Sequence, residues 1–500
     1  MSAPTTGTSG VTGGAAPAAA HTDRYEMVVG LEVHVQLKTR TKAFCNCPTD
    51  FGAPPNQNTC PVCLALPGTL PVLNLHAVEL AVRAALALRC TVHERSVFAR
   101  KNYFYPDLPK GYQISQFDRP LATGGVLVIG ETRDGGDLQV GITRVHMEED
   151  AGKSIHDRYA GASAIDLNRA GMPLVEIVSE PDMRSAAEAG AYLRVLKQIL
   201  EYAGVSDVSM EEGSLRVDAN VSARLRGETR LGTKTEVKNM NSFSGVERAL
   251  EAEFARQCAL LDRGESVVQH TMLWDGAKGE VRPSRTKEGS HDYRYFPEPD
   301  LPPLILTREW IEKQRDAIPE LPVARRERFV REYALPDGDA EVLTASRALA
   351  DYFEGVARQH GDPKTAANWV MGEVLAALNA TAQSPDHFSV RPADLAQLLN
   401  MVRDGLVSHS AAKRIFGRMV ETGDRPEQIA EREGLLQVGD TGQLDAWIDE
   451  AIAKHPAEWE RLKGGEKKLL GVLVGAVMKL SRGSADPKRV NQLLLERSGG

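Results

Sequence analysis

An acidic residue and a histidine share one face of a short stretch near the start of the chain. In Met27–Leu37 (MVVGLEVHVQL) apolar residues alternate with Glu32 and His34, which is the period of a β-strand. Same-face neighbours on a strand lie roughly 7 Å apart, so one cation or one substrate can contact both side chains. An edge strand with a solvated polar face explains the same alternation. Other stretches must decide between these interpretations.

Two further carboxylates interrupt stretches that are otherwise apolar. Glu149 ends an alternating run that begins at Thr143, and Glu176 interrupts the apolar run Leu174–Val178. A buried carboxylate is costly unless it is paired or binds a metal ion. The two glutamates therefore predict one shared cation, which favours a chemical role for the strand at Met27–Leu37.

Four of the six cysteines form two close pairs, Cys45 with Cys47 and Cys60 with Cys63. This spacing presents four thiolates tetrahedrally to zinc. Disulfides are the alternative, and a reducing cytosol disfavours them. Because four thiolates close the coordination sphere, zinc in this knuckle (residues 45–63) is expected to be structural.

Alternating strands and helices must position these groups. The periodicity predicts helices at Asn74–Cys90, Ser185–Tyr202 and Val246–Leu261. It predicts strands at 126–149 (a hairpin turning at Asp134-Gly135-Gly136), within 172–182, and at 211–225 and 233–243. One face of the strand at 211–225 carries Arg216, Asp218 and Asn220, which suit a nucleotide or a ribose. A solvated sheet face is the alternative.

An aromatic and basic loop follows the first predicted helix. Tyr103 and Tyr105 lie beside Arg100 and Lys101, so this loop can stack a base and hold a phosphate. A tightly packed irregular loop explains the same composition.

Bulk composition describes an ordinary globular protein. The chain has 500 residues, 42% of them hydrophobic and 26% charged, with a formal net charge of -8, and this length predicts roughly three domains. Residues 1–20 have neither a charged start nor an apolar segment and predict a disordered tail. No apolar run reaches the length of a membrane span, so we expect a cytoplasmic protein.

The last forty residues are basic although the whole chain is acidic. Residues 461–500 contain nine Lys or Arg against three acidic residues, an excess of six positive charges. Such asymmetry predicts a polyanion partner, and a solvated helical tail is the alternative. Prolines concentrated in Pro297–Pro303 predict a domain boundary, beyond which the pattern is helical.

Seven motifs together resemble one family over essentially the whole chain after the N-terminal tail. They are GLEVHVQL, the cysteine quartet, KNYFYPDLPKGYQISQFD, HMEEDAGKS, PLVEIVSEPD, EEGSLRVDANVS and DYRYFPEPDLPPL, and the family is the B subunit of the tRNA-dependent aspartyl/glutamyl amidotransferase. The resemblance implies an α+β protein: a disordered tail (1–24), a kinase-like, β-rich cradle domain (25–303), an all-helical domain (304–405) and a helical tail domain that holds tRNA (406–500).

The resemblance also implies an activity. Family members use ATP to phosphorylate the side-chain carboxylate of Glu-tRNA(Gln) or Asp-tRNA(Asn), and ammonia then displaces the phosphate. An amidase A subunit releases the ammonia from glutamine, and a small C subunit completes a heterotrimer. Phosphorylation is needed because a free carboxylate has only oxide as its leaving group, and Mg²⁺ neutralises the charge that develops in phosphoryl transfer.

Site residues follow from the same resemblance. The magnesium ligands correspond to His34, Glu149 and Glu176, with Glu32 and Glu148 as catalytic or substrate-contacting neighbours. Lys101 is expected to contact the transferred phosphate and, with Tyr103, to bind ATP. Zinc is expected at Cys45, Cys47, Cys60 and Cys63, and tRNA at the tail residues Lys467, Lys468, Lys479, Arg482, Lys488 and Arg489.

Two other functions compete with this one. The chain can be a non-catalytic tRNA-binding scaffold whose acidic strands hold a structural ion, or a metal-dependent hydrolase acting on a phosphoester. The basic tail favours the two functions that involve tRNA over the hydrolase.

Overall fold

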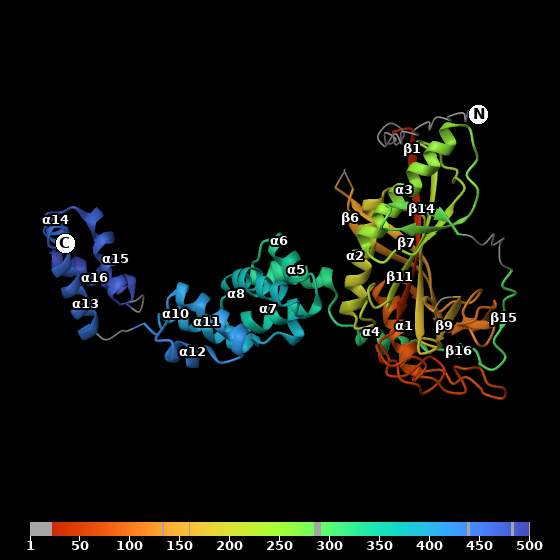
Figure 1. The fold of residues 1–500 in the computed structure, drawn as a ribbon, viewed down its shortest axis with the longest axis horizontal. Coiled ribbons are helices and arrows are strands. Elements are labelled where there is room, and N and C mark those ends of the chain that lie inside the picture. The colour runs from red at the N-terminus through yellow and green to blue at the C-terminus, as the bar shows by residue number, and fades with distance from the viewer. Residues whose placement is uncertain are drawn as a thin grey trace, which may run out of the picture. The chain divides into compact units, whose positions relative to one another are not determined.

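The computed structural model describes residues 23–132, 135–159, 161–284, 292–437, 441–481 and 485–499. The chain divides into two compact units, Met1–Leu321 and Pro322–Gly500 (Figure 1). The first contains a large sheet with helices and the second is helical, which confirms the predicted α+β class. Most of the expected disordered tail, Asp134 of the predicted hairpin turn, and Arg482 lie outside the described residues.

The first unit contains four α-helices and sixteen strands within the described residues. Their bounds are β1 Tyr25–Gln36, α1 Leu75–Ala87, β2 Thr91–Val92, β3 Arg95–Ser96, β4 Ala99–Asn102, β5 Tyr112–Ser115, β6 Ala122–Glu131, β7 Asp137–Glu149, β8 Lys153–Tyr159, β9 Ala162–Asp166, β10 Pro173–Ser179, α2 Ala186–Tyr202, β11 Leu215–Leu225, β12 Thr235–Lys238, α3 Phe243–Asp262, β13 Thr271–Asp275, β14 Glu280–Pro283, β15 Phe296–Pro297, β16 Leu304–Ile305 and α4 Arg308–Asp316.

Strand β1 lies at the centre of a nine-stranded sheet with the order β14-β13-β12-β11-β1-β10-β7-β6-β2. All pairings in it are antiparallel except that of β12 with β13. Leu31, Val33 and Val35 of β1 are fully buried in a core that also contains the apolar faces of α1, α2 and α3. The alternation in β1 therefore separates an apolar face, covered by helices, from a polar face.

Local side-chain caps begin the helices that cover this sheet. Asn74 accepts hydrogen bonds from the backbone N–H groups of His76 and Ala77 at the start of α1. Ser185 accepts from the N–H of Glu188 at the start of α2, and Ser242 from Gly245 at the start of α3. These caps satisfy backbone donors that have no partner within the helix, so the sequence defines the helix starts locally.

The residues that follow the proline cluster Pro297–Pro303, where a domain boundary was predicted, pack on the first unit. Residues 304–321 belong to the first unit. Leu306 and Ile311 are buried in its core, and Gln314 of α4 accepts a hydrogen bond of 3.0 Å from Arg83 of α1. The proline cluster therefore ends the sheet region, but α4 still packs on the first unit.

The second unit contains helical elements only, within the residues that the structure describes. They are α5 Pro322–Tyr333, α6 Asp337–Leu343, α7 Arg347–His360, α8 Pro363–Trp369, a π-helical turn Val370–Val374, α9 Leu375–Thr381, a 3₁₀ turn Pro385–His387, α10 Pro392–Arg403, α11 His409–Thr422, α12 Pro426–Arg432, α13 Thr441–Lys454, α14 Pro456–Lys463, a 3₁₀ turn Lys467–Leu469, α15 Leu470–Leu480 and α16 Pro487–Ser498.

Two features organise this second unit. Glu354 of α7 is buried and bonded to Arg325, Arg328 and Tyr333 of α5 at 2.6–2.8 Å. Residues of α13 to α16 form a core of their own around Leu444, Leu473 and Val477. No helix among the described residues is long and apolar enough to cross a membrane.

Candidate active site

Strand pairing places acidic and imidazole groups in one row across the polar face of the sheet. His34 of β1 lies opposite Glu176 of β10, and Glu176 lies opposite His146 of β7. Glu148 follows His146 by two residues on β7, so its side chain is on the same face. The register alone therefore gathers residues that are far apart in the sequence.

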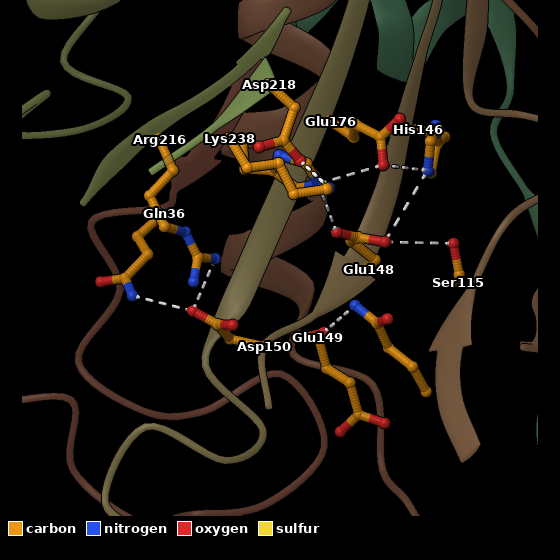
Figure 2. Close-up of polar contacts among 12 residues, drawn as sticks. Gln36, Ser115, His146, Glu148, Glu149, Asp150, Glu176, Arg216, Asp218 and Lys238 are labelled. Atoms are coloured by element: carbon orange, nitrogen blue, oxygen red, sulfur yellow. Dashed lines mark hydrogen bonds and ion pairs between the residues drawn. The ribbon is translucent and has the colours of Figure 1, made fainter. Parts of the chain in front are cut away.

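The side chains of this row converge on one point. His34 Nε2 lies 3.2 Å from Glu176 Oε2 and 3.5 Å from Glu148 Oε1. His146 Nε2 lies 3.5 Å from Glu176 and 3.9 Å from Glu148, and Figure 2 shows Glu148, Glu176 and His146 directed toward one another. One ligand atom from each of His34, Glu148 and Glu176 lies within 4.8 Å of the others, so these three residues can hold a metal ion.

The electrostatics of the row favour positive charge at its centre. Burial lowers the pKa of His34, but the hydrogen bond to Glu176 and the charges of Glu148 and Glu176 outweigh burial and raise that pKa to about 9. Burial and then the charge of Glu176 raise the pKa of Glu148 to about 7. Burial lowers the pKa of His146 to about 4. The raised pKa values of His34 and Glu148 show that this buried site favours an added positive charge, either a proton or a metal ion.

Glu149, one of the three predicted magnesium ligands, lies apart from this cluster. Its carboxylate accepts a hydrogen bond of 3.0 Å from the backbone N–H of Ile114 and pairs with Lys110, and Figure 2 shows it directed away from Glu148. Adjacent residues of a strand point to opposite faces. Since Glu176 shares a face with His34, the β7 carboxylate that lies near both is Glu148, whereas the predicted ligand Glu149 points to the opposite face.

Lys101 and Tyr103 lie beside the row, on strand β4 and just after it. The Lys101 Nζ atom lies 5.0 Å from the centre of the Tyr293 ring. Burial lowers the pKa of Lys101, but the charge of Glu148, among others, outweighs burial and raises it. The Tyr103 hydroxyl donates a 3.0 Å hydrogen bond to Gln113, whose amide donates to the backbone oxygen of Glu149. The charge of Glu148 therefore acts on Lys101, and Tyr103 is linked through Gln113 to the end of β7.

Glu32 lies two residues before His34 on the same face of β1, and it borders a separate hollow. Its carboxylate accepts a 2.9 Å hydrogen bond from Asn220, and burial with the nearby charge of Glu176 raises its pKa. The hollow has a volume of about 270 Å³ and is lined in part by Gly30, Ser222 and Lys234. Glu32 therefore flanks the His34 cluster instead of joining it.

Other polar residues extend the face, and the sequence alone did not identify most of them. Asp150 accepts hydrogen bonds from Gln36 at 3.2 Å and from Arg216 at 2.8 Å. Lys238 of β12 pairs with Asp218 at 2.6 Å, and Figure 2 shows these groups around the cluster. His146 was missed, although its spacing of two from Glu148 is the available signal. Lys238 gave no such signal because the pairing of β12 with β11, which brings it beside Asp218, is known only from the fold.

The four cysteines lie together as predicted. All four are free thiols, and their sulfur atoms lie within 4.8 Å of one another. The fully buried Lys42 donates hydrogen bonds to the backbone oxygen of Asn58 at 2.7 Å and to the Cys63 sulfur at 3.7 Å. Four sulfur donors beside a buried cation fit a zinc tetrathiolate.

The basic tail residues predicted to bind tRNA, apart from Arg482, belong to the helical segments that form the core of α13 to α16. Lys467 and Lys468 occupy the 3₁₀ turn before α15, and Lys479 lies in the last turn of α15. Lys488 and Arg489 lie in the first turn of α16. Lys467, Lys468, Lys479 and Lys488 are exposed, whereas the neighbouring Arg461 and Arg497 are held in ion pairs with acidic residues.

The fold and the site together define an α+β protein with a cluster on a sheet, formed by His34, Glu148 and Glu176, that could hold a cation, and a separate group of four cysteines. Two family models match: GatB/GatE catalytic domain over residues 27–312 and GatB domain over residues 351–497.

Curated relatives agree with these matches over nearly the full length. The chain is 52% identical over 476 residues to the B subunit of the aspartyl/glutamyl-tRNA(Asn/Gln) amidotransferase of Carboxydothermus hydrogenoformans, covering 95% of this chain and 98% of the relative. It is 53% identical over 480 residues to the B subunit of the same name from Geotalea uraniireducens, covering 95% and 100%. The chain belongs to the family of aspartyl/glutamyl-tRNA(Asn/Gln) amidotransferase B subunits.

Proposed function

We propose that this chain activates the side-chain carboxylate of glutamate or aspartate esterified to tRNA(Gln) or tRNA(Asn), using ATP, so that ammonia converts it to the amide. Membership of the amidotransferase B family supports this activity. The observation that carries the residue assignment is the convergence of His34, Glu148 and Glu176 on one face of the sheet.

A divalent cation fits the donor set of this cluster. Two carboxylates supply the hard oxygen ligands that Mg²⁺ and Mn²⁺ prefer. An imidazole is an uncommon Mg²⁺ ligand, so His34 either acts through a water molecule or favours Mn²⁺. When bound, the cation neutralises charge on the phosphate oxygens during phosphoryl transfer.

The chain's own residues position the substrates around this point. Lys101 of β4, on which the charges of Glu148 and Glu176 act, is assigned to a phosphate oxygen of ATP. Tyr103 contacts the same Tyr293 ring as Lys101 and is assigned to the nucleotide. A lysine ammonium is a compact charge suited to phosphate. Glu32, which lines its own hollow beside the cluster, is assigned to the substrate side of the reaction. These roles need no nucleophilic Cys or Ser, because the reacting carboxylate belongs to the substrate.

The remaining assignments concern structure and assembly. Zinc bound by the cysteine quartet stabilises the knuckle and takes no part in the chemistry. The kinase-like cradle is assigned to the first unit and tRNA binding to the basic residues of the tail. The release of ammonia from glutamine is assigned to an amidase A subunit. A small C subunit is assigned as the third member of a heterotrimer. Charged tRNA for protein synthesis implies a cytoplasmic site of action.

The test compares the unchanged chain with Glu148→Gln and Glu176→Gln in the reconstituted amidotransferase. Phosphate release from ATP is measured with Glu-tRNA(Gln) and, separately, with Asp-tRNA(Asn), and glutamine hydrolysis by the partner is recorded in parallel. We expect both variants to lose tRNA-dependent phosphate release and to keep tRNA binding. Unaltered phosphate release in both variants would refute the metal assignment.

A further inference from the structure

Five aromatic rings form a continuous row beside the acidic cluster. In order they are Tyr105, Tyr103, Tyr293, Tyr295 and Phe117, called here the aromatic row. Three neighbouring pairs meet edge to face with ring centres 6.0–6.1 Å apart. The fourth pair, Tyr295 with Phe117, is stacked at 4.1 Å with an angle of 6° between the ring planes.

The two segments that supply the row are fixed to each other by backbone and side-chain bonds. The N–H of Asn102 donates to the backbone oxygen of Tyr293 at 3.0 Å, and its side-chain amide donates to the oxygens of Tyr293 and Arg294. Strand β15 continues this pairing along β4. Arg100 binds Glu298 through two hydrogen bonds of 2.7 and 2.8 Å. The row is therefore held in place before any ligand arrives.

The middle of the row adjoins the catalytic cluster and its ends are open to solvent. Lys101 lies over the Tyr293 ring, and Ser115, two residues before Phe117, donates a 3.4 Å hydrogen bond to Glu148. At the ends, Tyr105 is 52% and Phe117 is 55% exposed. Since Tyr295 covers one face of Phe117, the exposed area leaves the other face for a further planar group.

The chemistry of the row fits unpaired nucleotides. Aromatic side chains stack bases of any sequence, and nearby cations hold the phosphates. Lys101 lies over the Tyr293 ring in the middle of the row, and the exposed Arg294 lies between two of its tyrosines in the sequence. ATP has a single base, whereas the row offers several rings in sequence. A single-stranded RNA end uses such a surface more completely.

We propose that the aromatic row binds the unpaired 3′-terminal nucleotides of the aminoacylated tRNA and so delivers the esterified amino acid to the cluster of His34, Glu148 and Glu176. This inference rests on the proposed function, because that reaction requires the 3′ end of tRNA to reach the cluster. It adds the surface that binds this end.

The experiment uses Phe117→Ala and Tyr105→Ala in the full chain assembled with its partner subunits. Tyr159→Ala is the matched control, since Tyr159 is an exposed aromatic residue (56%) on β8, and Phe117→Tyr is the conservative variant. The probes are an acceptor-stem RNA hairpin that ends in four unpaired nucleotides, with 2-aminopurine at the terminal position, and the same hairpin with a blunt end. Fluorescence reports stacking and affinity without turnover.

We expect each alanine variant at the row to weaken binding of the overhanging hairpin by about 10-fold or more. Binding of the blunt hairpin, the KM for ATP and the behaviour of Tyr159→Ala should not change, and Phe117→Tyr should keep the affinity. Equal binding of the overhanging hairpin by all variants would overturn the proposal. A rise in the KM for ATP alone would assign the row to the nucleotide, and loss of subunit assembly would assign it to a partner subunit; either result overturns it.

These outcomes are separable from failure of the proposed function. RNA binding is measured without ATP or glutamine, so an enzyme that failed to release phosphate would still report on the row. Conversely, the alanine variants of the row could bind the hairpin normally while Glu148→Gln and Glu176→Gln are inactive. That result would refute the role of the aromatic row in RNA binding and leave the proposed function in place.

Discussion

Two adjacent glutamates of β7 offer the sharpest test of the site, because they point to opposite faces of one strand. Glu148 lies 3.5 Å from His34 in the cluster, whereas Glu149 pairs with Lys110 and the backbone of Ile114. The substitutions Glu148→Gln and Glu149→Gln remove the same charge from neighbouring positions. We expect them to change different properties of the protein.

The expected loss of metal affinity in Glu148→Gln follows from two limits. Mutating a residue that hydrogen-bonds to a metal ligand typically lowers metal affinity about 10- to 100-fold. Losing a ligand itself should therefore lower metal affinity by at least about 100-fold. Two unit charges about 4 Å apart interact by about 4 kcal/mol at an effective dielectric constant of 20, which corresponds to roughly 1000-fold. We therefore expect Mn²⁺ affinity to fall by about 100- to 1000-fold, with little change in thermal stability.

Glu149→Gln should give the opposite pattern. The Lys110–Glu149 pair is mostly buried, with 13% and 3% of the side chains exposed, and breaking a buried pair costs about 3 kcal/mol or more. The Tm should therefore fall by several degrees while Mn²⁺ affinity stays within about twofold of the unchanged chain. Mn²⁺ binding is followed by electron paramagnetic resonance and Tm by calorimetry. If Glu149→Gln lost the metal and Glu148→Gln kept it, the assignment from strand register would be refuted.

Three further predictions concern other parts of the chain. Cys63→Ser should lower bound zinc from one ion per chain to none and lower the Tm, whereas Cys258→Ala, which lies outside the quartet, should keep the zinc. Elemental analysis after dialysis measures the zinc content. Equal zinc in both variants would refute the zinc tetrathiolate. Burial raises the pKa of Glu354, but hydrogen bonds from its arginine and tyrosine partners outweigh burial and lower it to about 2. The ionised carboxylate should therefore stabilise the fold by about 3 kcal/mol above pH 4.5, and this contribution should disappear as the pH falls from about 4.5 to about 2. A Glu354→Gln variant with the same acid denaturation curve as the unchanged chain would contradict this. Changing Lys467, Lys468, Lys479 and Lys488 together to Gln should weaken tRNA binding and reduce the slope of log affinity against log salt concentration by about one for each phosphate that is no longer neutralised. Because all four side chains are exposed, the Tm should change by no more than a few degrees. An unchanged salt slope would show that these tail residues do not contact the tRNA.

The sequence by itself determined the local elements and the chemical inventory. The alternation of Glu32 and His34 with apolar residues predicted β1, and the side-chain caps at Asn74, Ser185 and Ser242 mark the starts of helices that the apolar periodicity predicted. The spacing of the four cysteines predicted their convergence. These features depend on residues close together in the chain, so their physical causes can be read from the sequence.

Only the tertiary structure decided which distant groups meet. The pairing of β1 with β10 and of β10 with β7 places His34, Glu176 and His146 in one row and selects Glu148 over Glu149, because a shift of one residue in a strand moves a side chain to the other face. The same long-range packing keeps α4 on the first unit and joins Tyr293 and Tyr295 to Tyr103 and Phe117. Strand register depends on the burial of the whole sheet, and no single segment of the sequence contains that information.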